Sequence, residues 1–485
     1  MAYGGGIFSE QNKSLPGAYI NFNTVAPTTS IFGTRGTVAL ALPIATPEGK
    51  VLEWTFEDFK KNCKTIFNID WATTEGTGTD YWCVQAIREL FCNATKVIIS
   101  GLVNHISTGI EDDDEFSVID KGIKYTTSGK YEFYNSEIAV IKSNTNYSGR
   151  LTIRNTNNEE VYSYTCDTNK SSLKDLLTSL FAEANENQEF VEFSISSDAE
   201  LPTITTSSKT ISVTLKYTAN LSIDSSNAYN LHYKSIEELS KKSFNILTCI
   251  HFDDTTEYEV EKIKKAYDEF TKDQRDNYGV KFQTVYFDYP EANHESAISL
   301  SKENNKNLIF WTAGALAGAS FAESLCNKTY NGELELSTLG ADQDPATLEN
   351  AIATGSFIFH TVGDTVRVLD DINTYIDAGE NKEKDPEIFN DNQSIRVIDQ
   401  IGNDIATIFV NNYLGKIPSD DSGRSSFWNA LVDYHNQMQD LGGIQNFTSS
   451  DISVTAGTQR NSVVVNEVIT LGSTMKKLYM TVTVQ

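Results

Sequence analysis

The sequence predicts a multidomain protein of mixed α+β and α/β class, and three observations carry that prediction. The chain has 485 residues, which is enough for about three domains at roughly 150 residues each. Strand-like and helix-like apolar patterns alternate in two separate stretches, which is typical of an α/β layer. Between them lies a stretch rich in Ser, Thr, Asn and Tyr whose short alternating runs predict antiparallel strands.

These patterns divide the chain into two arms and three domains. We expect an N-terminal arm over residues 1–35 and a C-terminal arm over residues 474–485. The domains are expected to be a discontinuous α/β middle domain over residues 36–101 and 241–349, an inserted β-rich domain over 102–240, and a C-terminal α/β domain over 350–473.

The composition argues against several classes of protein. Lys+Arg total 39 and Asp+Glu 66, so the net charge is −27, whereas nucleic acid and anionic lipid attract basic surfaces. A hydrophobic share of 39% argues against disorder. The N-terminus lacks a signal-peptide pattern, and the apolar stretch at residues 307–322 is shorter than the ~20 residues of a membrane span. Six scattered cysteines without a CxxC pair predict reduced thiols in a protein made in a cytoplasm.

The first α/β stretch begins with a buried strand. Thr55 and Asp58 form an acidic variant of the capping box, so a helix should start there. Asp80 is expected to cap the next helix. The elements predicted here are strands over residues 37–45 and 96–101 and helices over residues 55–67 and 81–92.

The β-rich stretch is interrupted by one helix and followed by a return of the α/β pattern. In the β-rich stretch we expect strands over residues 131–142, 150–154, 161–164, 190–194 and 210–217, and a helix over 173–183. In the second α/β stretch we expect strands over residues 244–252, 280–288 and 308–312, and helices over 257–270, 295–301 and 313–325.

The last third of the chain predicts two short strands, a charged linker, two long helices and closing strands. The helices carry apolar stripes at helical spacing, and Gly442 and Gly443 end the second. The elements are strands over residues 356–360 and 365–370, the linker over 377–386, helices over 394–413 and 425–441, and strands over 452–455, 462–470 and 477–484.

No motif predicts a catalytic residue, a cofactor or a metal. The chain contains no Walker loop, no GxGxxG after a strand, no HExxH and no GxSxG. The acidic run at residues 111–115 lacks the ligand spacing of a calcium loop, so we interpret it as a solvated loop. Gly314 and Gly318 are four apart, which predicts close packing of a helix on a sheet or, as the less favoured alternative, an anion site at a helix start.

Both ends of the chain carry an isolated strand pattern. Tyr19, Ile20 and Phe22 suit a strand without a local partner, and so does the alternating run at residues 477–484. Addition of such strands to another subunit would satisfy their backbone groups. If donor and acceptor surfaces differ, the contact is heterologous and generates rings or helical tubes. The residues therefore favour an assembly protein over an enzyme.

Four stretches give the chain a resemblance to a known family. They are residues 15–22 (LPGAYINF), 313–332 (AGALAGASFAESLCNKTYNG), 366–374 with 396–416 (VRVLDDINT and RVIDQIGNDIATIFVNNYLGK), and 477–484 (KLYMTVTV). In this order they resemble the tail sheath proteins of contractile, myovirus-type bacteriophages and related phage-tail-like particles, most like those of Gram-positive hosts. The resemblance covers the first ~100 residues and those from ~240 onward, which leaves the β-rich insertion outside it.

The resemblance implies a mechanism of assembly. Sheath subunits would form hexameric rings stacked as a six-start helix around a tail tube, with the C-terminal domain facing the tube and the middle and β-rich domains facing outward. Each subunit would lend its arms to neighbours, which join them into a shared sheet. The donated strands would be Ala18, Tyr19, Ile20, Asn21 and Phe22, and Leu478, Tyr479, Met480, Thr481, Val482, Thr483 and Val484; the receiving strands would be Ile452, Ser453 and Val454, and Val463, Val464, Val465, Asn466, Glu467 and Val468.

The resemblance also implies partners and a location. Tail tube, baseplate and tail terminator proteins would contact the assembled sheath, while nucleic acid and membranes would not be bound by the subunit itself. The sheath would be part of the virion, made in the cytoplasm of the host bacterium. Its contraction, with hinges near residues 36, 350 and 377–386, would drive the tube through the host envelope for genome delivery without a nucleotide.

Two other functions remain compatible with the sequence. A self-assembling surface lattice or adhesin would suit the β-rich insertion and the acidic charge, although such a protein needs a secretion signal. An α/β enzyme would suit the middle domain, although fold alone does not give function.

Overall fold

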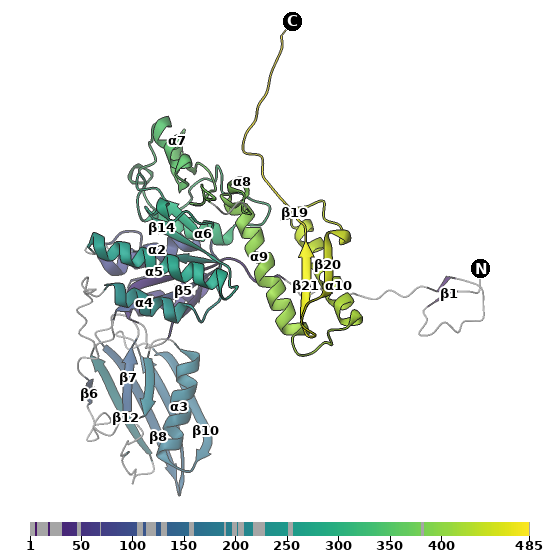
Figure 1. The fold of residues 1–485 in the computed structure, drawn as a ribbon. Coiled ribbons are helices and arrows are strands. Elements are labelled where there is room, and N and C mark those ends of the chain that lie inside the picture. Colours follow the sequence, from purple (N-terminus) through teal and green to yellow (C-terminus); the bar gives the residue numbers. More distant parts are fainter. Residues whose placement is uncertain are drawn as a thin grey trace.

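The computed structural model describes most of the chain and shows three bodies with an extended C-terminal segment (Figure 1). The described residues are 5–6, 18–19, 32–45, 50–67, 69–103, 110–112, 123–127, 133–154, 160–188, 191–195, 201, 208–216, 228–250, 256–379 and 383–484.

The central body is built on a seven-stranded sheet that joins two distant parts of the chain. Its strand order is β16-β15-β14-β13-β3-β5-β4, and only the edge strand β4 runs antiparallel to its neighbour. The bounds are β3 Thr37–Ala45, β4 Leu52–Thr55, β5 Lys96–Val103, β13 Ile246–Thr248, β14 Gln283–Phe287, β15 Ala297–Leu300 and β16 Ser356–Phe357.

Helices cover both faces of this sheet, so its strands are apolar on both sides. Along β3, Val38 and Leu40 belong to the core on one face, whereas Ala39 belongs to the core on the other. The first face is covered by α1 (Phe56–Phe67), α2 (Thr79–Phe91) and α6 (Leu308–Gly318), and the second by α4 (Ala228–Leu239) and α5 (Glu257–Asp276). Helix α4 and strand β16 lie in this body, although the boundaries predicted at residues 240 and 350 place them in neighbouring domains.

Two predictions in the second α/β stretch are wrong. Residues 295–301 were expected to be helical, but Ala297–Leu300 form the buried strand β15. Residues 308–312 were expected to be a strand, but they begin α6, which ends at Gly318 and not at residue 325. Every residue from Leu308 to Ala317 is buried, and a continuous apolar run has no period that separates a strand from a helix.

The spacing of Gly314 and Gly318 serves helix packing. A Cβ atom at Gly314 would lie 2.4 Å from the carbonyl oxygen of Leu90, and one at Gly318 would lie 2.1 Å from that of Asn93. Since real Cβ atoms do not come that close, only glycine lets α6 approach the end of α2. The glycines therefore allow close packing, as predicted, but their partner is the end of helix α2 and not the sheet.

The helix starts on this face were predicted with mixed success. The Thr55 backbone N–H donates to Asp58 Oδ2 (2.9 Å) and the Asp58 N–H donates to Thr55 Oγ1 (3.3 Å), so the capping box is confirmed. The predicted Asp80 cap is wrong, because Gly78 occupies the N-cap of α2 with a positive φ of 92°. Asp80 lies in the first turn, where its negative charge interacts favourably with the positive end of the helix dipole.

The described residues of the inserted region up to residue 216 form antiparallel strands and one helix, as the alternating pattern predicts. A five-stranded sheet has the order β10-β9-β8-β12-β6, and β7 pairs with β11. The bounds are β6 Ile110–Asp112, β7 Ile123–Thr127, β8 Phe133–Ser143, β9 Asn146–Arg154, β10 Glu160–Lys170, α3 Leu173–Asn187, β11 Val191–Ile195 and β12 Ser208–Lys216.

The C-terminal part packs two helices against a β-hairpin. Its core is formed by α9, α10 and the hairpin, and Phe32 and Phe321 from elsewhere in the chain join it. The bounds are α7 Pro345–Ala353, β17 Phe359–Val362, β18 Thr365–Val368, α8 Pro386–Phe389, α9 Asn392–Ile408, a π-helical turn Phe409–Tyr413, α10 Asp421–Asp440, β19 Ile444–Gln445, β20 Ile452–Ala456, β21 Val463–Glu467 and β22 Thr470–Leu471; short 3-10 turns lie at Pro290–Ala292, Leu336–Thr338 and Ser449–Asp451.

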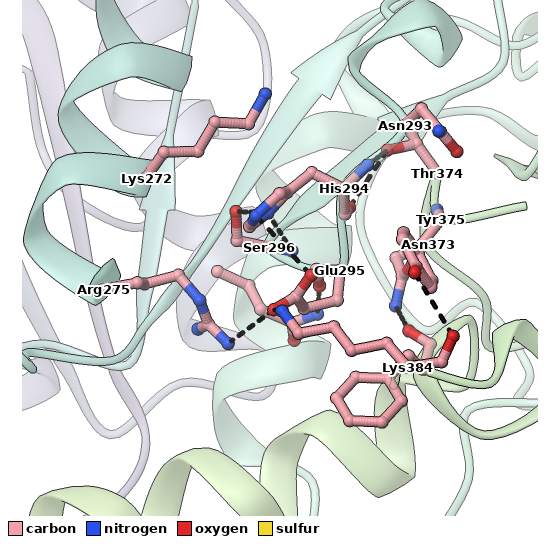
Figure 2. Close-up of polar contacts among 12 residues, drawn as sticks. Lys272, Arg275, Asn293, His294, Glu295, Ser296, Asn373, Thr374, Tyr375 and Lys384 are labelled. Atoms are coloured by element: carbon pink, nitrogen blue, oxygen red, sulfur yellow. Dashed lines mark hydrogen bonds and ion pairs between the residues drawn. The ribbon is translucent and has the colours of Figure 1, made fainter. Parts of the chain in front are cut away.

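A buried polar joint connects the central body to α9. The guanidinium of Arg275 donates to both carboxylate oxygens of Asp399 at 2.6 and 2.8 Å, and both side chains are less than a tenth exposed. Glu295 lies beside this pair and accepts from Lys384 Nζ at 2.5 Å (Figure 2). The Asn293 side chain bonds the backbone of Asp377. The linker at residues 377–386 is thus bonded to the central body near both of its ends, and its role as a hinge stays a prediction.

His294 is held neutral within this joint. Its Nδ1 accepts from the Ser296 backbone N–H at 3.2 Å, so the proton of the neutral ring sits on Nε2, which faces Glu295 Oε2 at 3.5 Å. Burial lowers the pKa of His294 to about 4, and nearby Lys272, Arg275 and Lys384 oppose its protonation while Glu295 favours it.

We predict that His294 makes the fold sensitive to acid. Below its unfolded pKa of about 6.5 the unfolded chain binds a proton that the folded chain refuses, so stability is lost as the pH falls toward 4. Urea unfolding at pH 7 and pH 5 gives the free energy of unfolding at each pH. Between the two, this free energy should fall by about 2 kcal/mol less in His294→Asn than in the unmodified protein. An asparagine can still accept the Ser296 N–H in an Asx turn. Equal losses in the two proteins would contradict the prediction.

Candidate assembly interface

The C-terminal arm leaves the body after Lys476 and is exposed along its whole length. Leu478 and Tyr479 are 86% and 89% exposed, and Val484 is 88% exposed. No residue from Lys477 to Val484 belongs to a helix or strand, so the strand predicted here is not formed within one subunit. Figure 1 shows this segment running away from the C-terminal body.

The side chains of the arm alternate in character. In an extended conformation Leu478, Met480, Val482 and Val484 fall on one face, and Tyr479, Thr481 and Thr483 on the other. The large members of the aliphatic face are between 68% and 88% exposed. Covering an apolar face of this kind with another surface is favourable in water, which marks the arm as a candidate interaction site.

The N-terminal donor segment is described only in part. Ala18 and Tyr19 form β2, which pairs in parallel with β1 (Gly5–Gly6) of the same chain. Two residues of this predicted donor strand thus pair with Gly5 and Gly6 of the same chain, a partner that the sequence analysis did not identify. Ile20, Asn21 and Phe22 lie outside the described residues.

The N-terminal segment enters the body at the C-terminal core. The ring of Phe32 lies 5.0 Å from that of Tyr434 on α10, and the Gly33 N–H donates to Asp404 Oδ1 on α9 at 2.9 Å. Residues 32–35, which the sequence assigns to an arm, are thus bound to the body. Both arms leave the body next to α9: Gly33 bonds Asp404 on this helix, and Lys476 bonds Asp391 at its N-cap.

The predicted receiving segments form one β-hairpin. β20 and β21 pair antiparallel with Ile452 opposite Glu467 and Val454 opposite Val465. Ser453, Val464 and Asn466 lie on the exposed face, and Val468, which follows β21, is 76% exposed. Ile452, Val454, Val463 and Val465 face the C-terminal core.

The hydrogen-bond pattern shows which backbone groups point outward from the hairpin. The Val468 N–H donates to the Asp451 carbonyl, and the Gly457 N–H donates to the Ser462 carbonyl. In an antiparallel ladder every second pair of residues is hydrogen-bonded, so every second pair counted from these two is bonded and the pairs that alternate with them are not. The N–H and C=O groups of Val454 on one strand, and of Val463 and Val465 on the other, therefore face away from the partner strand. None of these outward groups has a bond to another described residue.

The two outer edges of the hairpin differ. On β20, the Trp428 indole N–H donates to the outward carbonyl of Ile452 at 3.0 Å, which occupies part of that edge. Beside Val463 of β21 lies a groove of about 390 Å³ with an aromatic and aliphatic lining. Its apolar lining includes Phe409, Tyr413, Leu414, Ile417, Phe427 and Val463.

Strand β21 also has a polar contact with α10, between a buried histidine and a partly exposed carboxylate. His435 is fully buried, and its Nδ1 donates to the Leu431 carbonyl at 2.8 Å. Its Nε2 faces Glu467 Oε2 at 3.3 Å. Because Nδ1 donates to a carbonyl, Nε2 is the ring nitrogen that is left to meet the carboxylate, and the two atoms form the polar contact between α10 and β21.

Sequence patterns missed the residues that fix these surfaces. Trp428, His435 and Lys476 are single polar groups, and nothing in their spacing indicates their partners. Each partner lies in another element, such as Glu467 for His435 or Asp391 for Lys476.

The comparisons with known proteins agree with this architecture. The sequence model described as "Phage tail sheath protein central domain" matches residues 216–374, and that described as "Phage tail sheath C-terminal domain" matches residues 384–485. Together the two matches cover more than half of the chain. This chain belongs to the phage tail sheath family. The gap between the two matches, residues 375–383, overlaps the charged linker at residues 377–386.

Relatives and solved structures extend the likeness over the whole sheath protein. The Bacillus subtilis phage-like element PBSX protein XkdK is 24% identical over 509 residues, covering 99% of both chains. The B. subtilis protein YqbK is 26% identical over 510 residues, covering 99% of this chain and 100% of YqbK. The crystal structure of a sheath tail protein from Desulfitobacterium hafniense has a TM-score of 0.59 at 21% identity and covers 96% of this chain and 99% of its own. A sheath tail protein from Listeria innocua gives 0.59 at 20% identity, with coverages of 92% and 94%.

Membership of this family assigns a structural role in a phage tail or phage-tail-like particle. The family is not enzymatic, which decides against the α/β enzyme considered above. Within the described ranges, no group of three or more His, Cys, Asp or Glu side chains is placed to hold a metal ion. None of the described helices has both the length and the apolarity of a membrane span.

We predict that Glu467 stabilises the sheath subunit through His435. Glu467→Ala should lower the free energy of unfolding by about 1–3 kcal/mol, because it leaves a buried imidazole nitrogen without a partner. Glu467→Gln should recover most of this loss, since its amide N–H can donate to a neutral Nε2. Asn466→Ala, on the exposed face of the same strand, is the control. Urea unfolding measures all three, and an equal loss for Glu467→Ala and Asn466→Ala would contradict the role of His435.

Proposed function

We propose that this sheath protein is the repeating subunit of a contractile tail sheath whose subunits are joined by exchanged strands. The observation that carries the proposal is the coexistence, in one chain, of an exposed apolar arm and a hairpin with open outer edges. Each surface is incomplete alone, and the two are complementary. Because they are different surfaces, their contact propagates from subunit to subunit.

The arm and the edge of β21 suit each other chemically. A strand added at Val463, Val465 and Glu467 gains backbone hydrogen bonds, and its alternate side chains lie over the groove beside Val463. The aliphatic face of Leu478, Met480, Val482 and Val484 supplies such side chains, each worth about 1.5–3 kcal/mol when fully buried. We assign this edge to the C-terminal arm of a neighbour. The remaining outward groups of β20, at Val454 and Ala456, are assigned to the N-terminal donor strand at residues 18–22.

The proposed polymer consists of hexameric rings stacked as a six-start helix around the tail tube. The C-terminal domain faces the tube, and the middle and β-rich domains face outward. Baseplate and tail terminator proteins bind the two ends of the cylinder. The sheath is made in the cytoplasm of the host bacterium and becomes part of the virion.

Contraction follows from a difference in subunit contacts between two lattices. Strands shared between subunits keep the lattice connected while the bodies rotate. The extended cylinder is held by a kinetic barrier, and the contracted lattice gains contacts. This stroke drives the tube through the host envelope for genome delivery and requires no cofactor.

We predict that deletion of residues 477–485 leaves a folded subunit that does not polymerise. The described part of this segment makes no contact that holds the fold together, so circular dichroism and melting temperature should be unchanged. Loss of the apolar face should lower the fraction of polymer at least about tenfold. Electron microscopy and sedimentation measure the polymer. Normal cylinders from the shortened protein would refute strand exchange by this arm.

A proline at Val465 should test the receiving edge separately. The Val465 N–H points outward, so Val465→Pro keeps the bonds between β20 and β21 and removes a donor that the added strand needs. We expect the variant to fold and not to polymerise. Val465→Ala keeps the N–H and should still polymerise. Cylinders formed equally by both variants would exclude this edge.

A further inference from the structure

Lys476 is bound to the body by two carboxylates at the place where the C-terminal arm becomes free. Its Nζ donates to Asp370 Oδ1 at 2.7 Å and to Asp391 Oδ1 at 2.9 Å. The three side chains are about one-fifth exposed, at 23%, 23% and 19%. Burial alone would lower the pKa of Lys476, but the charges and hydrogen bonds of Asp391 and Asp370 outweigh it and raise this pKa. The contact is therefore a bond between one cation and two anions.

The other attachments of this segment are weak. Strand β22 has two residues, Thr470 and Leu471, which pair with Gln445 and Ile444. Beyond it, Gly472 N donates to Gly443 O at 2.8 Å and Thr474 Oγ1 to Gln393 Oε1 at 3.3 Å. A two-residue ladder at the end of a chain frays easily.

The carboxylates connect Lys476 to stiff parts of the fold. Asp391 is the N-cap of α9, where its Oδ2 accepts from the Ser394 N–H at 2.8 Å. The neighbour of Asp370, Asp371, is fully buried and bonded to Arg396 of α9. A force on Lys476 is therefore transmitted to the N-terminus of α9.

We propose that Lys476 anchors the C-terminal arm, so that tension from a neighbouring subunit is carried by α9 and does not peel β22 from β19. This inference rests on the proposed exchange of the arm. The anchor also fixes where the arm starts. From Lys476 the eight residues to Val484 reach about 26 Å, whereas from Gly472 the twelve residues would reach about 40 Å. A longer and looser tether lowers the local concentration of the arm at its acceptor.

Lys476→Met tests the anchor, and Lys477→Met is the matched control. Both variants remove one positive charge at the base of the arm and keep a long side chain, but Lys477 is exposed and makes no described ion pair. In the unassembled full-length subunit, Lys476→Met should speed hydrogen exchange of the amides at residues 470–476 about tenfold. It should also raise the protein concentration needed for polymerisation about tenfold. Lys477→Met should change neither.

Asp370→Asn provides a second variant that does not alter the arm. An asparagine retains the oxygen that accepts the Asp371 N–H and removes one of the two charges on Lys476. It should reproduce part of both effects. Wild-type exchange and wild-type polymerisation in Lys476→Met, or in Asp370→Asn if the former does not fold, would overturn the anchor.

The exchange measurement separates this inference from the proposed function. If deletion of residues 477–485 leaves polymerisation intact, strand exchange by the arm is refuted, and the proposed role of Lys476 under tension is refuted with it. If the deletion prevents polymerisation while Lys476→Met behaves as the wild type in both assays, only the anchor is refuted.

Discussion

Unpaired backbone and apolar side chains on the same exposed strand are the constraint on which this structure depends. The C-terminal arm presents both to water, and so do the outer edges of the hairpin. Exposed edges and apolar strands invite uncontrolled association. A net charge of −27 supplies a long-range repulsion between subunits, which short-range strand pairing must overcome. Under the proposed strand exchange, association is restricted to geometries in which the arm and the edge meet in register.

The rest of the fold holds in place the residues at which the two arms leave the body. Helix α9 connects the buried pair of Arg275 and Asp399 to the carboxylate of Asp404 that binds the N-terminal segment. Its N-terminus carries Asp391, which binds the base of the other arm. The two departure points are consequently separated by a single helix and move with it. In the proposed lattice, a rotation of α9 would carry both arms with it.

Local patterns in the sequence were sufficient for elements that show their periodicity. The strand at residues 37–45, the capping box at Thr55 and Asp58, and the helices of the C-terminal core were predicted close to their observed bounds. The patterns failed at β15, a four-residue strand whose apolar residues are interrupted by Ser299, and at the start of α6, where a continuous apolar run has no visible period. The hairpin and the arm were located by alternation together with family resemblance. The polar contacts that orient them, such as Trp428 with Ile452, join groups far apart in the chain and leave no local signal.

The β-rich region begins and ends at one place on the central sheet. Leu102, near the end of β5, packs against Leu231 in the first turns of α4, so the chain leaves the sheet and returns to it at neighbouring points. The seven strands are ordered without any contribution from the excursion between them. The region is therefore an excursion from a sheet that is complete without its strands, but its buried side chains, such as Leu151 and Leu180, belong to the same apolar cluster as Val38 and Leu40 of that sheet. A change of packing inside the β-rich region would thus reach the core of the central body.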